Sequence, residues 1–240
     1  MIDLTKYFTL TDKMGIPIES KEMFGAEEGG LRATNFLLWL NSMNASAKCH
    51  WMIDMETLGL TDSCAIVQIG MAPFDPKGKG LYTHAYNGEY YSVTHNANLK
   101  VEGQLRYVDP ETKEWWETKN TANLHLLTGG TVLIADELNA LAKVFTNSSQ
   151  VWANSPSFDI DVLRHACKQW RVPLNLNFRN EWDVRTVSKL AGFTYGKEKD
   201  VFKEADEFWN RGPNAHDALN DVFSQIYKVQ RSIRILVEGE

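Results

Sequence analysis

Cysteine is scarce in this chain of 240 residues, which has only Cys49, Cys64 and Cys167. An odd number of widely spaced cysteines, with no C-x-x-C pair, argues against a disulfide framework and against a zinc site built from thiolates. Such a chain suits a reducing compartment. We therefore expect a cytoplasmic protein.

Long apolar stretches are also missing. No run approaches the roughly 18 residues that a membrane span requires. The first residues, MIDLTKYFTLTDK, lack the basic region and the apolar stretch of a signal peptide. We therefore expect no membrane partner.

Positive charge is in short supply, because the net charge at pH 7 is −6. A strongly basic face, the usual sign of a nucleic-acid-binding surface, is not indicated. A cluster of acidic residues that holds two divalent cations would nevertheless restore positive charge at one place. The acidity predicts weak non-specific binding to nucleic acid, and it does not exclude an enzyme that handles nucleic acid with metal ions.

The composition is otherwise that of a globular protein, with 43% hydrophobic and 23% charged residues. Met1–Gly30 is polar, whereas Leu31–Met43 has the apolar residues of one helix. We expect residues 1–48 to form an N-terminal extension that packs on a main domain of residues 49–240. A lid or a partner-binding arm is the alternative for the extension.

Apolar runs and helix or strand breakers beyond the extension predict an α/β fold. Three short strands are expected to form a meander, and helices and strands then alternate, so that a mixed five-stranded sheet is covered by helices. The expected strands are Trp51–Asp54, Ile66–Ala72, Tyr82–Val93, Gln150–Asn154 and Asn180–Val184. One helix is expected to begin at Asp109, and three more are expected at Asp136–Phe145, Ser155–Trp170 and Asn214–Val237.

Two carboxylates end the first predicted strand, in the sequence Ile53-Asp54-Met55-Glu56. Since side chains at i and i+2 of a strand point to the same face, Asp54 and Glu56 should project together. Carboxylates this close repel each other, and hard divalent cations with oxygen ligands relieve the repulsion. Taken alone, the pair is equally typical of a strand that becomes polar at its end.

Further candidate residues lie near the starts of two predicted helices. Asp159 falls in a first turn, where the helix dipole already favours an acid. Asn214 is expected to cap the closing helix, with Asp217 as a capping-box acid and Asp221 one turn further in, without a local partner. His216 lies in that first turn, where it is either a surface cap residue or a base, since an ordinary pKa of about 6.5 suits proton transfer.

Taken in order, Asp-x-Glu on the first core strand, Phe-Asp after a later strand and His-x4-Asp on the last helix resemble the DEDDh exonucleases of the ribonuclease-H-like superfamily. The resemblance covers roughly residues 49–235 and implies a ribonuclease-H-like fold. It also implies hydrolysis of phosphodiester bonds from the 3′ end of DNA, single-stranded or with an overhang. Nucleoside monophosphates would be released.

The resemblance also implies roles for the site residues. Asp54, Glu56, Asp159 and Asp221 would bind two divalent cations, Mg²⁺ or Mn²⁺, with Asp54 bridging both. Glu56 and Asp221 would complete the coordination of one ion. Asp159 would bind the other ion, partly through water. His216 would be the general base, a role typically worth about 10²–10⁴ in rate.

Two segments, DPETKEWW and WDVRT, narrow the resemblance to the phage exonuclease A group, which includes a mycobacterial exoribonuclease-like branch. Adjacent helical residues point about 100° apart. One of Trp115 and Trp116 can therefore be buried while the other faces the groove and stacks on a base, although both being buried is an equal alternative. Arg185 could meet a phosphate or pair with Asp183.

Thr57 and Leu58 match the positions where this family meets the terminal nucleotide, through a backbone amide toward the 3′ hydroxyl and an apolar side chain against the last base.

Two other functions remain open. One is a 3′–5′ exoribonuclease with the same site, since DNA and RNA differ only at the 2′-hydroxyl. The other is a catalytically inactive nucleic-acid-binding module. If the chain is phage-encoded, its compartment is the cytoplasm of an infected host cell.

Overall fold

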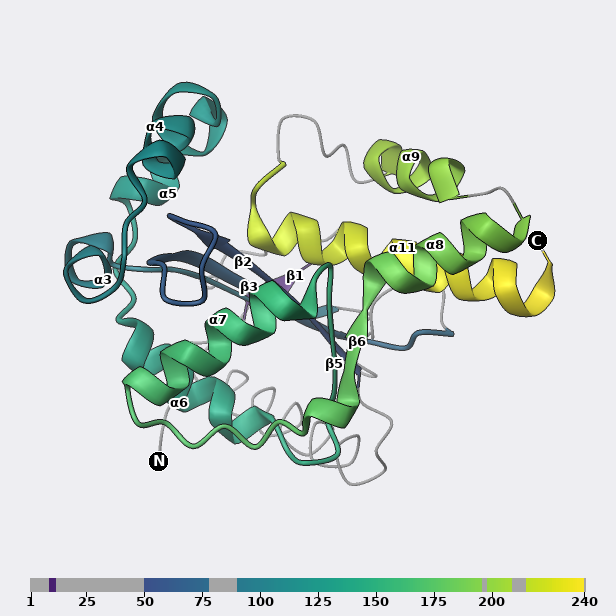
Figure 1. Cartoon of the computed structure of the whole chain (residues 1–240), viewed down its shortest axis with the longest axis horizontal. Helices are drawn as coiled ribbons and strands as arrows, with labels where there is room; N and C mark the ends of the chain where they lie inside the picture. The colour runs from purple at the N-terminus through teal and green to yellow at the C-terminus, as the bar shows by residue number, and fades with distance from the viewer. Residues whose placement is uncertain (1–8, 12–49, 78–89, 196–197, 209–214, 240) are drawn as a thin grey trace, which may run out of the picture.

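A mixed β-sheet runs through the part of the chain that the computed structural model describes, which is residues 9–11, 50–77, 90–195, 198–208 and 215–239 (Figure 1). The strands lie in the order β1-β4-β3-β2-β5-β6. Their bounds are Thr9–Thr11 (β1), His50–Thr57 (β2), Ile66–Phe74 (β3), Tyr90–Asn96 (β4), Gln150–Ala153 (β5) and Glu181–Asp183 (β6).

Helices flank this sheet. In Figure 1, α6 and α7 lie together, and α8, α9 and α11 form a second group. The α-helices are Leu99–Leu105 (α3), Pro110–Thr118 (α4), Leu124–Thr128 (α5), Ile134–Val144 (α6), Pro156–Gln169 (α7), Val184–Tyr195 (α8), Glu198–Phe208 (α9) and Ala218–Glu238 (α11); short 3₁₀ turns span Thr121–Asn123 (η2) and Phe178–Asn180 (η3). None of these helices is long and apolar enough to cross a membrane.

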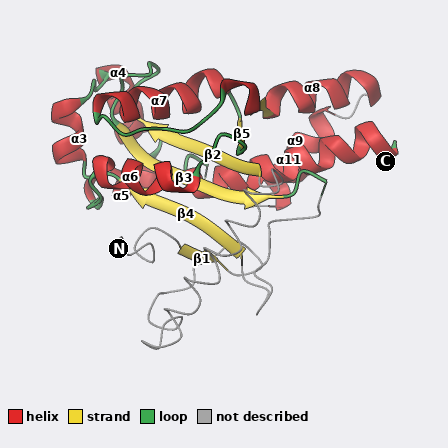
Figure 2. Cartoon of the chain, turned by 90° about the horizontal axis from the view of Figure 1, so that it is seen from below, coloured by secondary structure: helices red, strands yellow, loops and turns green. Residues whose placement is uncertain are grey.

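The predicted meander is confirmed, because β2, β3 and β4 pair antiparallel and lie side by side (Figure 2). β5 then pairs parallel with β2, and β6 parallel with β5, which makes the sheet mixed. The predicted count of five strands is wrong, since β1 from the N-terminal extension pairs with β4. Three residues, Thr9–Thr11, are too few to give a recognisable pattern. The helix expected at Leu31–Met43 lies outside the described residues, and the division at residue 48 stays a prediction.

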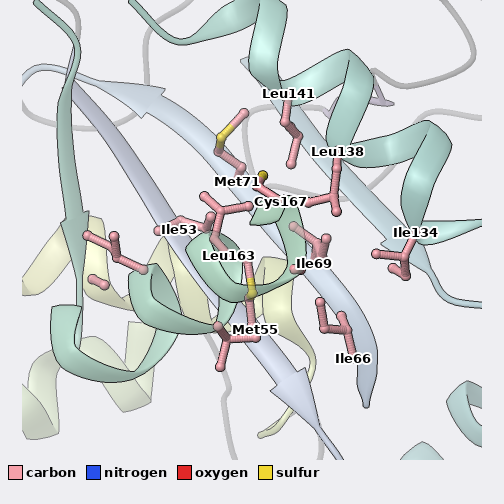
Figure 3. Packing of buried hydrophobic residues seen from close by; sticks show 14 of the residues in the cluster. Ile53, Met55, Ile66, Ile69, Met71, Ile134, Leu138, Leu141, Leu163 and Cys167 are labelled. Atoms are coloured by element: carbon pink, nitrogen blue, oxygen red, sulfur yellow. The ribbon is translucent and has the colours of Figure 1, made fainter. Parts of the chain in front are cut away.

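The main hydrophobic core fills one side of the sheet. Alternate residues of β2, including Ile53 and Met55, pack there with Leu138 of α6 and Leu163 of α7 (Figure 3). Met52, whose side chain is on the other face of β2, belongs to a second cluster, formed with α8 and α11 on the opposite side. The alternation along β2 therefore separates the two layers of helices.

Candidate active site

The two acids of β2 lie on the α11 side of the sheet, because they share the face of Met52. β2 is longer than predicted and includes both acids within its second half. Glu56 is 8% exposed and Asp54 is partly buried. The side-chain amide of Gln225 on α11 donates a hydrogen bond to Asp54 Oδ1 at 2.6 Å. The helix thus fixes one oxygen of the first predicted ligand.

Asp159 reaches the same region from the helix after β5. Since β5 runs parallel to β2, the carboxyl ends of the two strands meet at one edge of the sheet. Asp159 lies in the first turn of α7 and is 4% exposed. Its Oδ1 accepts the N–H of Met55 at 3.0 Å. This bond ties the α7 carboxylate to the strand residue between Asp54 and Glu56.

The start of α11 is docked directly on β3. Gly70 lies opposite Asp54 in the β2–β3 register, and a Cβ added to it would be 2.5 Å from the carbonyl carbon of Ala218. Only glycine allows this approach without a shift of backbone. The side chain of Gln68 donates to Asp217 Oδ2 at 3.1 Å and accepts the N–H of Ala218 at 2.7 Å. Both contacts fix the helix start against the sheet.

This closing helix begins later than predicted. Asp217 is its N-cap, and the side chain accepts the N–H of Asn220 at 3.0 Å. The prediction that Asn214 caps the helix is therefore wrong, as is the placement of His216 in the first turn; His216 precedes the helix in a left-handed conformation with φ of 63°. Aspartate is among the best N-cap residues, and Gln68 holds it there. Asn214 itself lies outside the described residues.

Three of the predicted site residues meet closely at this point. One ligand atom each from Glu56, His216 and Asp221 can be chosen so that all three lie within 4.8 Å of one another. Nδ1 of His216 is 3.9 Å from Glu56 Oε2. Asp221, in the first turn of α11, is 5% exposed. The arrangement places an imidazole directly beside two carboxylates.

Two carboxyl groups of the site, those of Asp54 and Asp159, have raised pKa values. The pKa of Asp54 is well above its usual range, first because of burial and then because of the charges of Asp159, Glu56 and Asp221. Burial also raises the pKa of Asp159 to about 7, although the N–H of Met55 lowers it. Negative charges held this close in a poorly hydrated place repel strongly.

A divalent cation fits this donor set. Mg²⁺ and Mn²⁺ take carboxylate oxygens as ligands, and a cation at this place would relieve the repulsion that raises the pKa of Asp54. Glu56, His216 and Asp221 offer donor atoms at the spacing of a shared ion. The residues predicted as ligands are thus brought together from β2, α7 and α11.

The two tryptophans of α4 point in different directions, as one of the two predicted alternatives requires. Trp116 is 1% exposed, and its Nε1 donates to the carbonyl oxygen of Thr57 at 3.1 Å. Trp115 is 37% exposed, and its ring centroid lies 4.8 Å from that of His216, with the rings nearly perpendicular. Trp115 is therefore the tryptophan that borders the site.

The other predicted substrate contacts are less open. Leu58 is 5% exposed, packs with Trp116, and donates its N–H to the carbonyl of Ala65 at 2.8 Å. Thr57 is 7% exposed, and its hydroxyl donates to the carbonyl of Gly59 at 2.7 Å. These contacts describe how the end of β2 is held, and the roles of both residues at a terminal nucleotide stay predictions.

Arg185 lies in α8, next to the site. Its positive charge lowers the pKa of Asp159, which places the guanidinium within electrostatic reach of the carboxylates. Its contact with Asp183 is made by the backbone, whose N–H donates to Asp183 Oδ1 at 3.0 Å. The side chain is exposed, and its contact with a phosphate stays a prediction.

Three residues that support the site were missed by the sequence analysis. Gln225 is four residues after Asp221 on α11, so helical spacing alone could have suggested that both face the same way. Gln68 is a buried polar residue within an apolar strand, which is also a recognisable signal. Asn123, whose amide contacts the residues before α11, has no such signal in the sequence.

The fold is ribonuclease-H-like, and several solved structures share it. S. pombe Pop2p in its Mg²⁺- and Mn²⁺-bound form is 16% identical, with a TM-score of 0.53 over 85% of this chain and 91% of that chain. The RNase domain of yeast Pop2 is 13% identical, with a TM-score of 0.55 over 86% and 85%. The zinc-bound E. coli ExoI–ssDNA complex is 13% identical, with a TM-score of 0.52 over 80% and 41%.

The sequence itself matches the 3′–5′ exoribonuclease Rv2179c-like domain over residues 49–233, and the chain belongs to that family. It is therefore a hydrolytic 3′–5′ exonuclease, as the resemblance implied. No curated protein sequence matches the chain.

Proposed function

We propose that the chain shortens nucleic acids from the 3′ end by two-metal hydrolysis, with Asp54, Glu56, Asp159 and Asp221 holding two divalent cations and His216 acting as general base. The observation that carries this proposal is the meeting of Glu56, His216 and Asp221 within 4.8 Å, next to Asp54. The Mg²⁺ and Mn²⁺ bound to Pop2p, which has a similar fold, support the choice of metals.

Two such cations, when bound, clamp the attacking and leaving oxygens of an in-line displacement. The chain's own residues orient the reaction. Asp54 is close enough to the other three carboxylates for their charges to raise its pKa, and Gln225 holds it, so it would be the central ligand. His216 stands beside Glu56, where its imidazole takes the proton of the attacking water.

RNA is our first candidate for the substrate, because the family is described as an exoribonuclease. DNA, which the resemblance to the phage group implies, is the second candidate, and the similar ExoI structure contains single-stranded DNA. Trp115 accepts either polymer, since stacking on an aromatic ring does not depend on the sugar. Thr57 and Leu58 remain assigned to the terminal nucleotide, and Arg185 to a phosphate.

End-labelled oligonucleotides test this proposal. Single-stranded RNA and DNA, labelled at either end, are digested with Mg²⁺, with Mn²⁺ and with EDTA, beside an Asp54→Asn variant. We expect metal-dependent shortening from the 3′ end that EDTA and the variant abolish, with RNA degraded faster than DNA. Faster degradation of DNA would reverse the substrate assignment. Shortening that persists in EDTA would contradict the metal mechanism.

The proposed base is tested separately. His216→Ala should lower kcat by about 10²–10⁴, while Mn²⁺ binding, measured by calorimetry, should be kept. A variant that also loses a metal ion would make His216 a ligand, which its place among the donor atoms would equally allow.

A further inference from the structure

We propose that Asn123 is a positioning residue, whose side-chain amide holds the backbone of His216 so that the imidazole faces Glu56 and Asp221. This inference rests on the proposed role of His216 as general base. Asn123 lies in η2, between α4 and α5, and it belongs to none of the elements that carry the acids. It would act on the reaction only through the histidine.

The need for such a residue follows from the backbone of His216. Its φ of 63° is in the left-handed region, which residues other than glycine rarely adopt. Conformations of this kind persist only where surrounding contacts over-determine them, and they gather at functional sites. A relaxed backbone at this position would carry the imidazole away from the carboxylates. The contacts that hold residues 215–218 therefore decide where the base stands.

Asn123 makes the contacts that are required. Its side chain is 5% exposed, and Nδ2 donates to the carbonyl oxygen of Ala215 at 2.7 Å and reaches that of His216 at 3.4 Å. The same nitrogen donates to Asn120 Oδ1 at 3.0 Å, which orients the amide. A buried amide satisfied in this way leaves little freedom to the two residues it holds.

The helix start is held from the other side as well. Gln68 of β3 bonds the side chain of Asp217 and the N–H of Ala218. Asn123 thus contacts Ala215 and the left-handed residue His216, and Gln68 contacts the two residues that follow them. The two sets of contacts have different effects, because Gln68 fixes the helix that carries Asp221, whereas Asn123 bonds the carbonyl groups of the loop that carries the base.

Position matters greatly for proton transfer. A general base must reach its proton at about 2.6–3.2 Å, and a displacement of about 1 Å can cost on the order of 10²-fold in rate. Asn123→Ala should therefore lower kcat by about 10- to 100-fold. KM and Mn²⁺ binding should change by less than about twofold, because no ligand or substrate contact is removed.

A double-mutant cycle distinguishes this role from a merely structural one. The variants are Asn123→Ala, His216→Ala and both together, and kcat is measured on 5′-labelled single-stranded RNA and DNA with Mn²⁺. If Asn123 acts through the histidine, replacing it in the His216→Ala background should change kcat by less than about twofold. Losses that multiply would show an effect on the whole fold and would overturn the proposal.

Controls keep the outcomes separate. Asn180→Ala removes a comparable amide bond to a loop carbonyl, that of Asn147, and should leave kcat unchanged. If Asn123→Ala does not fold, Asn123→Ser, whose side chain is too short to hold both carbonyls, takes its place in the cycle. Full activity of Asn123→Ala beside an impaired His216→Ala would contradict this inference alone. Full activity of His216→Ala would instead contradict the proposed function.

Discussion

Asp54 is the residue on which the charges of the site converge. Burial and three neighbouring carboxylates raise the pKa of Asp54. In the absence of metal, Asp54 therefore destabilises the fold as the pH rises above the ordinary pKa of an aspartate. Asp54→Asn removes this charge and keeps the oxygen that accepts from Gln225. We expect the variant to lose activity by more than about 10³-fold and to melt at the same temperature as the wild type or higher in EDTA at neutral pH.

A matched variant on α7 shows whether replacing any nearby acid has the same effect on activity and melting temperature as Asp54→Asn. Asp161→Asn makes the identical change two residues after Asp159, at an exposed carboxylate that lies 3.8 Å from Arg164. It should retain activity and melt close to the wild type. Retention of a tenth of wild-type turnover by Asp54→Asn would contradict its role as the bridging ligand.

The buried acid Glu137, on α6, leads to a second prediction, which concerns how stability depends on pH. Its side chain is fully buried, and burial raises the pKa from about 4.5 to about 8. The folded chain therefore keeps the proton over a range in which the unfolded chain has released it. The free energy of unfolding should fall as pH rises through this window, by at most about 1.4 kcal/mol per pH unit. Chemical denaturation at several pH values measures this slope.

Glu137→Gln should remove that part of the slope, so that the variant gains stability relative to the wild type between about pH 5 and pH 8. Glu114→Gln, an exposed change on α4, should follow the wild type throughout. Parallel curves for the wild type and Glu137→Gln would show that Glu137 is charged in the folded protein.

At the scale of elements, α4 has two faces with different tasks. Trp116 packs in a buried cluster with Leu58, and its Nε1 donates a hydrogen bond to the carbonyl of Thr57 in β2. Trp115 instead borders His216. Trp115→Ala should raise KM chiefly, by about tenfold, since stacking of one base on an aromatic ring is worth about 1–3 kcal/mol. Trp116→Ala should cost about 3–5 kcal/mol of stability.

Steady-state kinetics and thermal denaturation of the two α4 variants separate these tasks. Equal loss of stability from both would mean that both rings belong to the core. An unchanged KM for Trp115→Ala would remove the tryptophan from the substrate surface.

For the whole molecule, local patterns predicted what local chemistry determines. The alternation along β2 fixed the common face of Asp54 and Glu56, and Asp109 followed by Pro110 marked the start of α4, where the side chain of Asp109 accepts from Thr112. The meander of three antiparallel strands and the mixed character of the sheet also followed from apolar runs and their order.

Contacts between distant parts of the chain could not be predicted in this way. Gln225 meets Asp54 across 171 residues, and Gln68 meets Asp217 across 149. Neither side chain shows its partner in a local pattern. The left-handed backbone of His216 is likewise set by the residues around it, including Asn123. The N-cap of α11 is therefore Asp217 and not Asn214 as predicted. Tertiary contacts therefore decide the details of the site that the motifs only outline.

Anomalous diffraction from crystals grown with Mn²⁺ and a non-hydrolysable oligonucleotide tests the proposed two-metal site most directly. We expect two Mn²⁺ peaks roughly 3.5–4 Å apart, with Asp54 bridging them and the imidazole of His216 unligated. A single peak held by Glu56, His216 and Asp221, or no peak at these residues, would contradict it.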